Sequence, residues 1–499
     1  MNARHGETTP AGVVGVTAVL DRCTGARASL AFGRHFRKNC GQRLARRRVR
    51  YGLFRAVVAG AVAFCGFGIA ESAFSETVNW RQFAGTTITW AYDIHPYADA
   101  VVAQLPEFEK LTGIKVKPEL YPDDTYWNKL TVQLTTKSPA WDVVGTGIQP
   151  AWDLTPAGLL EPLNKYLADP KLTEASYDYN DFFPALRSAL TWTVKDGQIA
   201  TPGTGDIWAI PHAFENIQLL YRKDILDKYH IKVPQTPQEM VASCTALKAA
   251  DPAITPLAVR GVRFWSSIHT APISIAASYG VRDFIQKGDK LDTGLDSPAS
   301  VQFQKDYVAM IKSCAAPSFA NDNWYQVVDG ISTGRTAMAI DSNMFGFWND
   351  VAGKSSSGQI AFAPPLHAPG AKSFQSNIWI WSLAINAASK NKGAAWLFVQ
   401  WATSKQVDLN GALAGKLVNP PRVSTWNDKA WLAYASQPQF NNFVDTFKEV
   451  QQRASLLFTP RVGFSTAMND WAVAMQKMVN GANVNDTMRA LAKDIQANL

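Results

Sequence analysis

Cysteine and histidine are scarce in this 499-residue sequence, which contains five Cys and seven His. No HExxH or CxxC pattern occurs, and the histidines after residue 75 are not at metal-ligand spacing, so the common zinc and dithiol motifs are excluded. No GxSxG nucleophile motif occurs either. Residues 411–417 (GALAGKL) miss a phosphate-binding loop by one spacer residue and by Leu in place of Ser or Thr. These absences remove several large enzyme classes, and the sequence indicates no metal and no cofactor.

Charged residues make up only 18% of the chain, and the net charge of +8 is unevenly distributed. Residues 1–75 carry 12 Lys and Arg but three acidic residues, which leaves 37 basic and 38 acidic residues in 76–499. The basic character is therefore confined to the first 75 residues. Residues 76–499 have a net charge of −1 and lack the excess of positive charge that binds a polyanion, so we expect no nucleic-acid partner.

No apolar run reaches the ~20 residues that a membrane-spanning helix needs. The nearest is 56–70, with 15 residues, which follows a basic run at 43–55 and precedes Ala73 and Ser75, small residues at signal-peptidase spacing. This order predicts a signal peptide at 43–75, cleavage after Ser75 and export to the periplasm. Residues 1–42 precede a complete signal peptide, and we interpret them as an over-extended start.

Only Cys244 and Cys314 remain after that cleavage. They could be two buried free thiols or the two halves of one disulfide. An oxidising periplasm permits the bond, and we favour the disulfide.

Strand and helix patterns alternate along the predicted mature chain. Strands are expected at 87–92, 114–120 and 141–144, with helices at 98–112 and 126–136 between them. Such alternation is typical of an α/β fold with a mostly parallel sheet, in which ligands bind at the carboxyl ends of the strands.

The alternation continues further along the chain. We expect further strands at 207–211, 217–221, 336–340 and 378–385, helices at 239–250 and 299–312, and mainly helices from 392 onward. The predicted mature chain is longer than a single core usually supports, so two lobes are the default expectation.

Several motifs resemble extracellular solute-binding proteins of sugar ABC importers. The likeness covers essentially all of 80–499 and is carried by the segments 142–152 (DVVGTGIQPAW), 157–163, 208–215 (WAIPHAFE), 220–226, 334–341 (GRTAMAID) and 379–391. Within that family the sequence is most similar to proteins that bind polyols such as sorbitol and mannitol, through the segments 177–184, 260–265, 379–381, 401–405 and 420–422. It departs from that subgroup at Gly147 and Ile148, where the subgroup usually carries Tyr-Glu.

The resemblance implies a two-lobed periplasmic-binding-protein fold, with a hinge and a ligand cleft between discontinuous lobes. Lobe I would comprise 76–212 and 340–387, and lobe II would comprise 213–339 and 388–499, with Cys244 and Cys314 together in lobe II. It also implies a monomer without enzymatic activity that captures a sugar or sugar alcohol and delivers it to ABC permease subunits in the inner membrane. A secreted carbohydrate-active enzyme, a glycosidase or lyase, remains the alternative, because a catalytic carboxylate pair has no fixed sequence spacing.

A sugar or polyol presents hydroxyls and C–H faces, so its site needs charged or amide groups together with aromatic rings. The stacking candidates at motif positions are Trp152, Trp265, Phe345 and Trp379. The polar candidates are Asp93, Gln149, Glu215, Asp341, Asn343 and Arg461. Among them we expect Asp341 to be foremost, because it follows an apolar strand and adjoins Ser342, Asn343 and Phe345.

Overall fold

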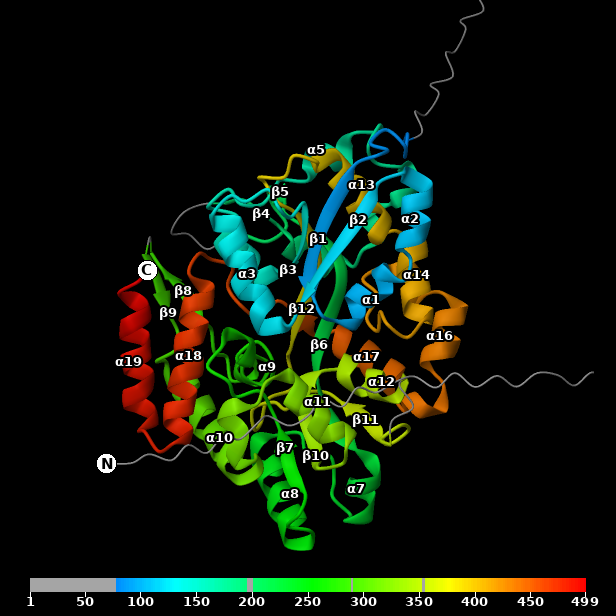
Figure 1. The fold of residues 1–499 in the computed structure, drawn as a ribbon. Helices are drawn as coiled ribbons and strands as arrows, with labels where there is room; N and C mark the ends of the chain where they lie inside the picture. The colour runs from blue at the N-terminus through cyan, green and yellow to red at the C-terminus, as the bar shows by residue number, and fades with distance from the viewer. Residues whose placement is uncertain (1–77, 195–200, 289, 352–354) are drawn as a thin grey trace, which may run out of the picture. The chain divides into compact units, whose positions relative to one another are not determined.

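The computed structural model describes residues 78–194, 201–288, 290–351 and 355–499. The predicted signal peptide and start site lie outside these residues. The described part contains a mixed sheet of nine strands in which neighbours run β2-β1-β3-β12-β6-β10-β7, with β11 paired to β6 and β13 paired to β12 (Figure 1). The bounds of these strands are β1 Thr87–Asp93, β2 Lys115–Tyr121, β3 Val143–Gly147, β6 Ile210–Arg222, β7 Thr255–Ala258, β10 Thr336–Ser342, β11 Ile360–Ala363, β12 Ser376–Ile385 and β13 Ala454–Ser455. The two-stranded sheets are β4 (Thr191–Trp192) with β5 (Asp206–Ile207), and β8 (Phe284–Lys287) with β9 (Lys290–Thr293).

The long strands β6 and β12 join two groups of shorter strands. β12 pairs antiparallel with β3, and the first half of β6, up to Asn216, pairs with β12. From Ile217 onward β6 pairs instead with β10 and β11. Residues 210–211 and 217–221 of the two expected strands are therefore parts of one 13-residue strand, because its residues are buried almost throughout and no turn interrupts them, while Ile207 belongs to β5.

The first strand group is covered by the helices α1 (Pro96–Val102), α2 (Leu105–Thr112) and α3 (Asp123–Thr135). β1 pairs parallel with both β2 and β3, as the alternation predicted. The single helix expected at 98–112 is wrong, because the chain breaks after Val102 and restarts with Pro106 in the first turn of α2. Proline has no N–H to donate within a helix but is well suited to its first turn.

The second strand group consists of β7, β10 and β11, and the helices near it include α8 (Pro237–Ala250), α10 (Pro298–Cys314), α11 (Trp324–Ser332) and α12 (Met344–Val351) (Figure 1). A disulfide joins Cys244 of α8 to Cys314 of α10, with the two Cα atoms 5.3 Å apart. Both cysteines are completely buried.

The chain after β12 is mainly helical, as the sequence predicted. The ring of Phe398, in α13 (Lys392–Ala402), lies 5.3 Å from that of Trp90, which attaches this helix to the first strand group. α18 (Phe464–Val479) and α19 (Val484–Gln496) pack together at the side of the second group (Figure 1).

The remaining helices of the described residues are α4 Ile148–Leu154, α5 Asn164–Ala168, α6 Pro184–Ala189, α7 Lys223–Lys228, α9 Ala271–Ser278, α14 Lys405–Leu413, α15 Val423–Trp426, α16 Lys429–Ala435 and α17 Phe443–Gln451. Short 3-10 turns are η1 Ala175–Tyr177, η2 Tyr179–Asp181, η3 Trp265–Ser267, η4 Pro317–Asn321 and η5 Pro438–Phe440.

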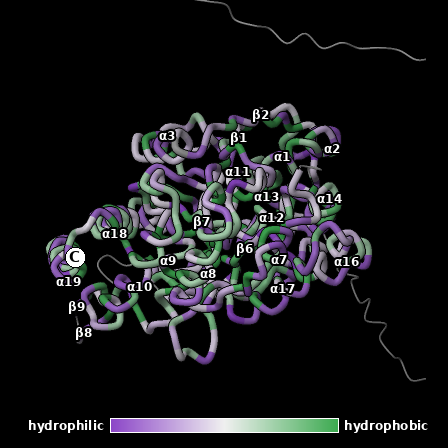
Figure 2. The backbone as a smooth tube through the Cα atoms, turned by 90° about the horizontal axis from the view of Figure 1, so that it is seen from below, coloured by the Kyte–Doolittle hydropathy of each residue, from purple (hydrophilic) through white to green (hydrophobic). Residues whose placement is uncertain are grey.

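The apolar core follows the central strands. Every residue of β3, β10 and β12 is buried, and Figure 2 shows the hydrophobic stretches concentrated around strands such as β6 and more hydrophilic ones at peripheral helices such as α16 and α19. In the part of the chain that the structure describes, no helix combines the length and apolar character needed to cross a bilayer.

Candidate ligand-binding site

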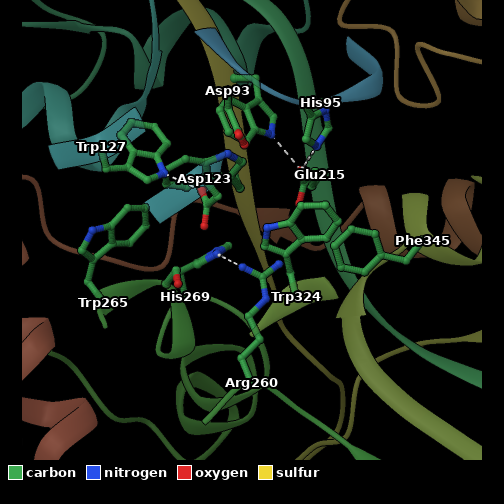
Figure 3. Close-up of a pocket in the computed structure, with 13 residues that line it drawn as sticks. Asp93, His95, Asp123, Trp127, Glu215, Arg260, Trp265, His269, Trp324 and Phe345 are labelled. Carbon is green, nitrogen blue, oxygen red and sulfur yellow. Dashed lines mark hydrogen bonds and ion pairs between the residues drawn. The ribbon is translucent and has the colours of Figure 1, made fainter. Parts of the chain in front are cut away.

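A small pocket of about 30 Å³ lies where the two strand groups meet, beside β6 and β12 (Figure 3). Six of its lining residues are tryptophan or phenylalanine, and four carry carboxyl or guanidinium groups. The lining residues are Asp93, His95, Asp123, Trp127, Glu215, Arg260, Trp265, Ser266, His269, Trp324, Phe345, Trp379 and Trp381.

One side of the pocket comes from the carboxyl end of β1 and the start of α3. β1 delivers Asp93, followed by His95, while α3 delivers Asp123 and Trp127. The Asp123 carboxylate accepts a hydrogen bond of 2.7 Å from the Trp127 indole N–H. Burial lowers the pKa of His95 to about 3, so its ring is neutral at physiological pH. Because His95 Nδ1 accepts the backbone N–H of Tyr97 at 3.2 Å, its proton resides on Nε2.

Glu215 occupies β6 at the back of the pocket. Its carboxylate accepts a hydrogen bond of 2.8 Å from the Trp381 indole, and His95 Nε2 lies 4.0 Å from the same oxygen. Burial raises the pKa of Glu215 to about 7, although the nearby positive charge of Arg260 acts in the opposite direction. This carboxyl can therefore either accept or donate a hydrogen bond near neutral pH.

Arg260 provides the positive charge on the opposite side of the pocket. Its guanidinium donates to both carboxylate oxygens of Asp341, at 2.8 and 2.7 Å, and lies 3.1 Å from His269 Nε2. Arg260 is 5% exposed and Asp341 is fully buried. A bidentate pair of this kind fixes the plane of the guanidinium, so Arg260 meets a ligand in a preset orientation.

Tryptophan rings form most of the apolar surface. Trp265 stacks on Trp379 with ring centroids 5.1 Å apart and planes inclined by 26°. Trp127 stacks on Trp381 in the same manner at 5.8 Å and meets the edge of Trp379 at 6.0 Å. These neighbours hold one another in place, because aromatic rings packed edge-to-face and in offset stacks gain energy beyond simple burial.

Two polar atoms of pocket residues are unpaired. Neither Ser266 Oγ nor His269 Nδ1 has a hydrogen-bond partner among the residues that the structure describes, although both atoms are buried. A guanidinium has donors only, so His269 Nε2 accepts from Arg260 and Nδ1 carries the proton of the neutral ring. Leaving a buried donor or hydroxyl without a partner costs folding free energy. Ser266 Oγ and His269 Nδ1 are therefore suited to form hydrogen bonds with a polar ligand.

Half of the residues expected from the sequence line this pocket: Asp93, Glu215, Trp265, Phe345 and Trp379. Asp341 lies behind Arg260 rather than in the pocket wall, and Asn343 exchanges hydrogen bonds with the side chain of Asn419.

The remaining three expected residues lie elsewhere. Gln149 and Trp152 are buried on α4, where the Trp152 ring meets the edge of Phe464. Arg461 lies over the ring of Phe284, 4.5 Å from its centroid.

Sequence reasoning missed eight lining residues: His95, Asp123, Trp127, Arg260, Ser266, His269, Trp324 and Trp381. Three of them carried a usable signal. His95 follows Asp93 in the turn after a predicted strand, while Arg260 and Trp381 begin and end motifs that also contain Trp265 and Trp379. Trp127 lies within the helix expected at 126–136, while Asp123 and Trp324 lie outside every expected helix, so only the folded chain reveals the place of these three residues.

Comparison with known proteins agrees with this geometry. Residues 93–408 match the family model described as bacterial extracellular solute-binding protein. The chain belongs to this family. The resemblance to solute-binding proteins seen in the sequence is thereby confirmed.

Two curated relatives are named for polyols. The chain is 30% identical to the erythritol/L-threitol-binding protein of Mycolicibacterium smegmatis, over 88% of this chain and 92% of that protein. It is 25% identical to the mannitol-binding protein of Pseudomonas aeruginosa, over 66% and 71% of the two chains.

Solved structures confirm the expected α/β periplasmic-binding-protein fold. A solute-binding protein from Agrobacterium radiobacter K84 in complex with ribitol superposes with a TM-score of 0.72 at 20% identity, covering 83% of this chain and 99% of that one. One from Agrobacterium vitis S4 with bound D-mannitol gives a TM-score of 0.68 at 22% identity, covering 83% and 98%.

Proposed function

We propose that this protein is the substrate-binding component of an ABC importer and that its ligand is a short acyclic polyol. The observation that carries the proposal is the pocket itself, in which stacked tryptophans face a fixed guanidinium and several carboxyl groups. The names of the two curated relatives, erythritol/L-threitol-binding and mannitol-binding, support the same class of ligand.

The chemistry of the pocket suits a polyol because every carbon of such a molecule bears a hydroxyl that both donates and accepts. Asp93 and Asp123 are acceptors, Arg260 is a donor, and Ser266 can serve as either. The C–H groups of the carbon chain would lie against Trp265 and Trp379. Hydrogen bonds to charged groups are worth about 1.5–3 kcal/mol each, so a few of them suffice for micromolar affinity.

We further propose that the molecule consists of two lobes that close around the ligand. The strand pairing favours boundaries at Asn216–Ile217 in β6 and at Asn377–Ile378 in β12, where each long strand changes partners. The family resemblance implied lobe boundaries at 212–213, 339–340 and 387–388. A ligand that contacts both lobes would favour the closed state by its differential affinity, and the importer would recognise that state.

The proposed protein acts in the periplasm as a monomer and releases its ligand chemically unchanged. Permease subunits in the inner membrane would receive the ligand. A glycosidase or lyase that used the same carboxylates would instead release a product, which distinguishes the alternative directly.

Calorimetric titration of the purified protein with erythritol, L-threitol, ribitol and mannitol tests the proposal. We expect saturable binding of at least one polyol and no product on prolonged incubation. Absence of binding to all four, or any chemical turnover, would overturn it.

A further inference from the structure

Gly147 lies at the end of β3, where the sequence departs from the polyol-binding pattern, and it is opposite Trp381 of β12. Its backbone angles, φ −86° and ψ 161°, are ordinary extended values that any residue adopts. Conformational freedom therefore does not account for glycine at this position.

The reason for glycine is space. A Cβ atom added to Gly147 would overlap three atoms of the Trp379 indole, Cη2, Cζ2 and Cζ3, all of which belong to its six-membered ring. This ring occupies the volume that a side chain at position 147 would fill. Any larger residue there would have to displace Trp379.

Trp379 cannot move without disturbing the pocket. Its indole is stacked on Trp265, meets the edges of Trp127 and Trp381, and lies 5.1 Å from the ring of His269. It is 2% exposed and lines the pocket directly. The indole thus forms a boundary of the pocket that is fixed on one side by other rings and on the other by the bare backbone of Gly147.

We infer that Gly147 and Trp379 act as one unit that determines the length of the bound polyol. The indole occupies the space above Gly147 and closes the pocket on that side, which disfavours a longer polyol chain relative to a shorter one. This inference rests on the proposed function, because it specifies the ligand of the same pocket. Gly147 is a specificity-determining residue that acts through the position of Trp379.

A double-mutant cycle read by thermal melting tests the packing without any ligand. Gly147→Ala should lower the melting temperature of the wild-type protein by several degrees but leave that of the Trp379→Ala protein nearly unchanged, because the overlapping ring is gone. Trp379→Phe, which removes the outermost ring atoms, provides a second background if Trp379→Ala does not fold.

Gly145→Ala is the matched control, since it lies on the same strand and its added Cβ would overlap the ring of Tyr92 instead. Gly145→Ala should lower the melting temperature by the same amount in the wild-type, Trp379→Phe and Trp379→Ala proteins. Equal costs of Gly147→Ala with and without the Trp379 indole would overturn the inferred unit.

Titration with erythritol and mannitol then tests selectivity. In the Trp379→Phe or Trp379→Ala protein, we expect the affinity for mannitol relative to erythritol to rise at least tenfold over the wild-type ratio. An unchanged ratio would overturn the inference while leaving the proposed function intact. If the wild-type protein binds neither polyol, the proposed function fails and the selectivity claim fails with it, while the melting cycle still reports the packing.

Discussion

The two sides of the pocket are built on different principles. The first wall, consisting of Asp93, His95, Asp123 and Trp127, is acidic, and its histidine is neutral because burial lowers the pKa of His95 to about 3. The second wall, consisting of Arg260, Trp265, Ser266, His269, Trp324 and Phe345, has a positive charge that Asp341 neutralises from behind. The helices α8 and α10 near that wall are joined by a disulfide.

The two walls therefore contribute to ligand binding in different ways. The second wall is rigid before any ligand arrives, because its charge is already paired and its orientation is fixed. The first wall contributes the carboxylates of Asp93 and Asp123, a type of group that accepts hydrogen bonds from hydroxyl groups. A polyol, which both donates and accepts along its length, satisfies both walls at once.

Breaking the ion pair of the second wall should have the largest effect. Asp341→Ala leaves the guanidinium of Arg260 buried without a counter-charge, and breaking a buried pair in this way costs about 3–5 kcal/mol. We expect chemical denaturation to show this loss together with weaker polyol binding.

The exposed pair Arg335–Asp329 is the control, and Asp329→Ala should cost less than about 1 kcal/mol. Equal stability losses for the two variants would show that Asp341 is not a support for the second wall.

Removing the disulfide should have an effect of similar size on stability but not on the ligand. The loop between Cys244 and Cys314 spans 70 residues, for which the chain-entropy model gives ~4 kcal/mol. The Cys244→Ser/Cys314→Ser double variant should unfold at lower denaturant concentration and still bind the polyol. Two alkylatable thiols in the native, unreduced wild-type protein would contradict the bond itself.

Glu215, between the two walls, should make stability depend on pH. Burial raises its pKa from 4.5 to about 7, so the folded protein retains a proton that the unfolded chain releases. The contribution of protonated Glu215 to the free energy of unfolding is fully present below about pH 4.5. It is lost as the pH rises through 7, a loss of about 3 kcal/mol.

Glu215→Gln removes the titration, so the stability of the wild-type protein relative to this variant should fall between pH 5 and 8. Burial lowers the pKa values of His95 and His212 to about 3, which makes stability rise with pH instead. Both proteins contain these histidines, so subtracting one stability from the other removes their effect. A difference that is constant with pH would refute the prediction.

Neutralising the first wall should affect binding alone. Asp123→Asn removes a charge that would accept ligand hydroxyls, so we expect affinity to fall about 10- to 150-fold, equivalent to about 1.5–3 kcal/mol. Stability should change by about 1 kcal/mol or less, because Asn at this position keeps an oxygen that can accept the Trp127 indole N–H. Asp99→Asn, at an exposed ion pair with Lys416, is the matched control and should bind normally.

Much of the fold was predictable because it depends on local patterns. The sequence predicted β1 and β2 from their alternating residues and β10 from its apolar run. Thr236 and Ser297 cap α8 and α10, as Thr and Ser commonly do at helix starts. The continuity of β6 was not predictable. Residues 212–216 contain His, Glu and Asn, which read as a break until their side chains are seen to be buried beside the pocket and β12.

The sequence by itself determined the family, the sheet-and-helix order and the kinds of side chain available to hold a ligand, since these follow from motifs and short-range periodicity. Only the tertiary structure decided which of those side chains meet. Asp341 satisfied every local criterion for a ligand contact, yet Arg260, 81 residues earlier, takes both of its oxygens and faces the pocket in its place. Strand order and helix packing set such long-range pairings, because they decide which strand ends and loops come together and which charges are neutralised before a ligand can reach them.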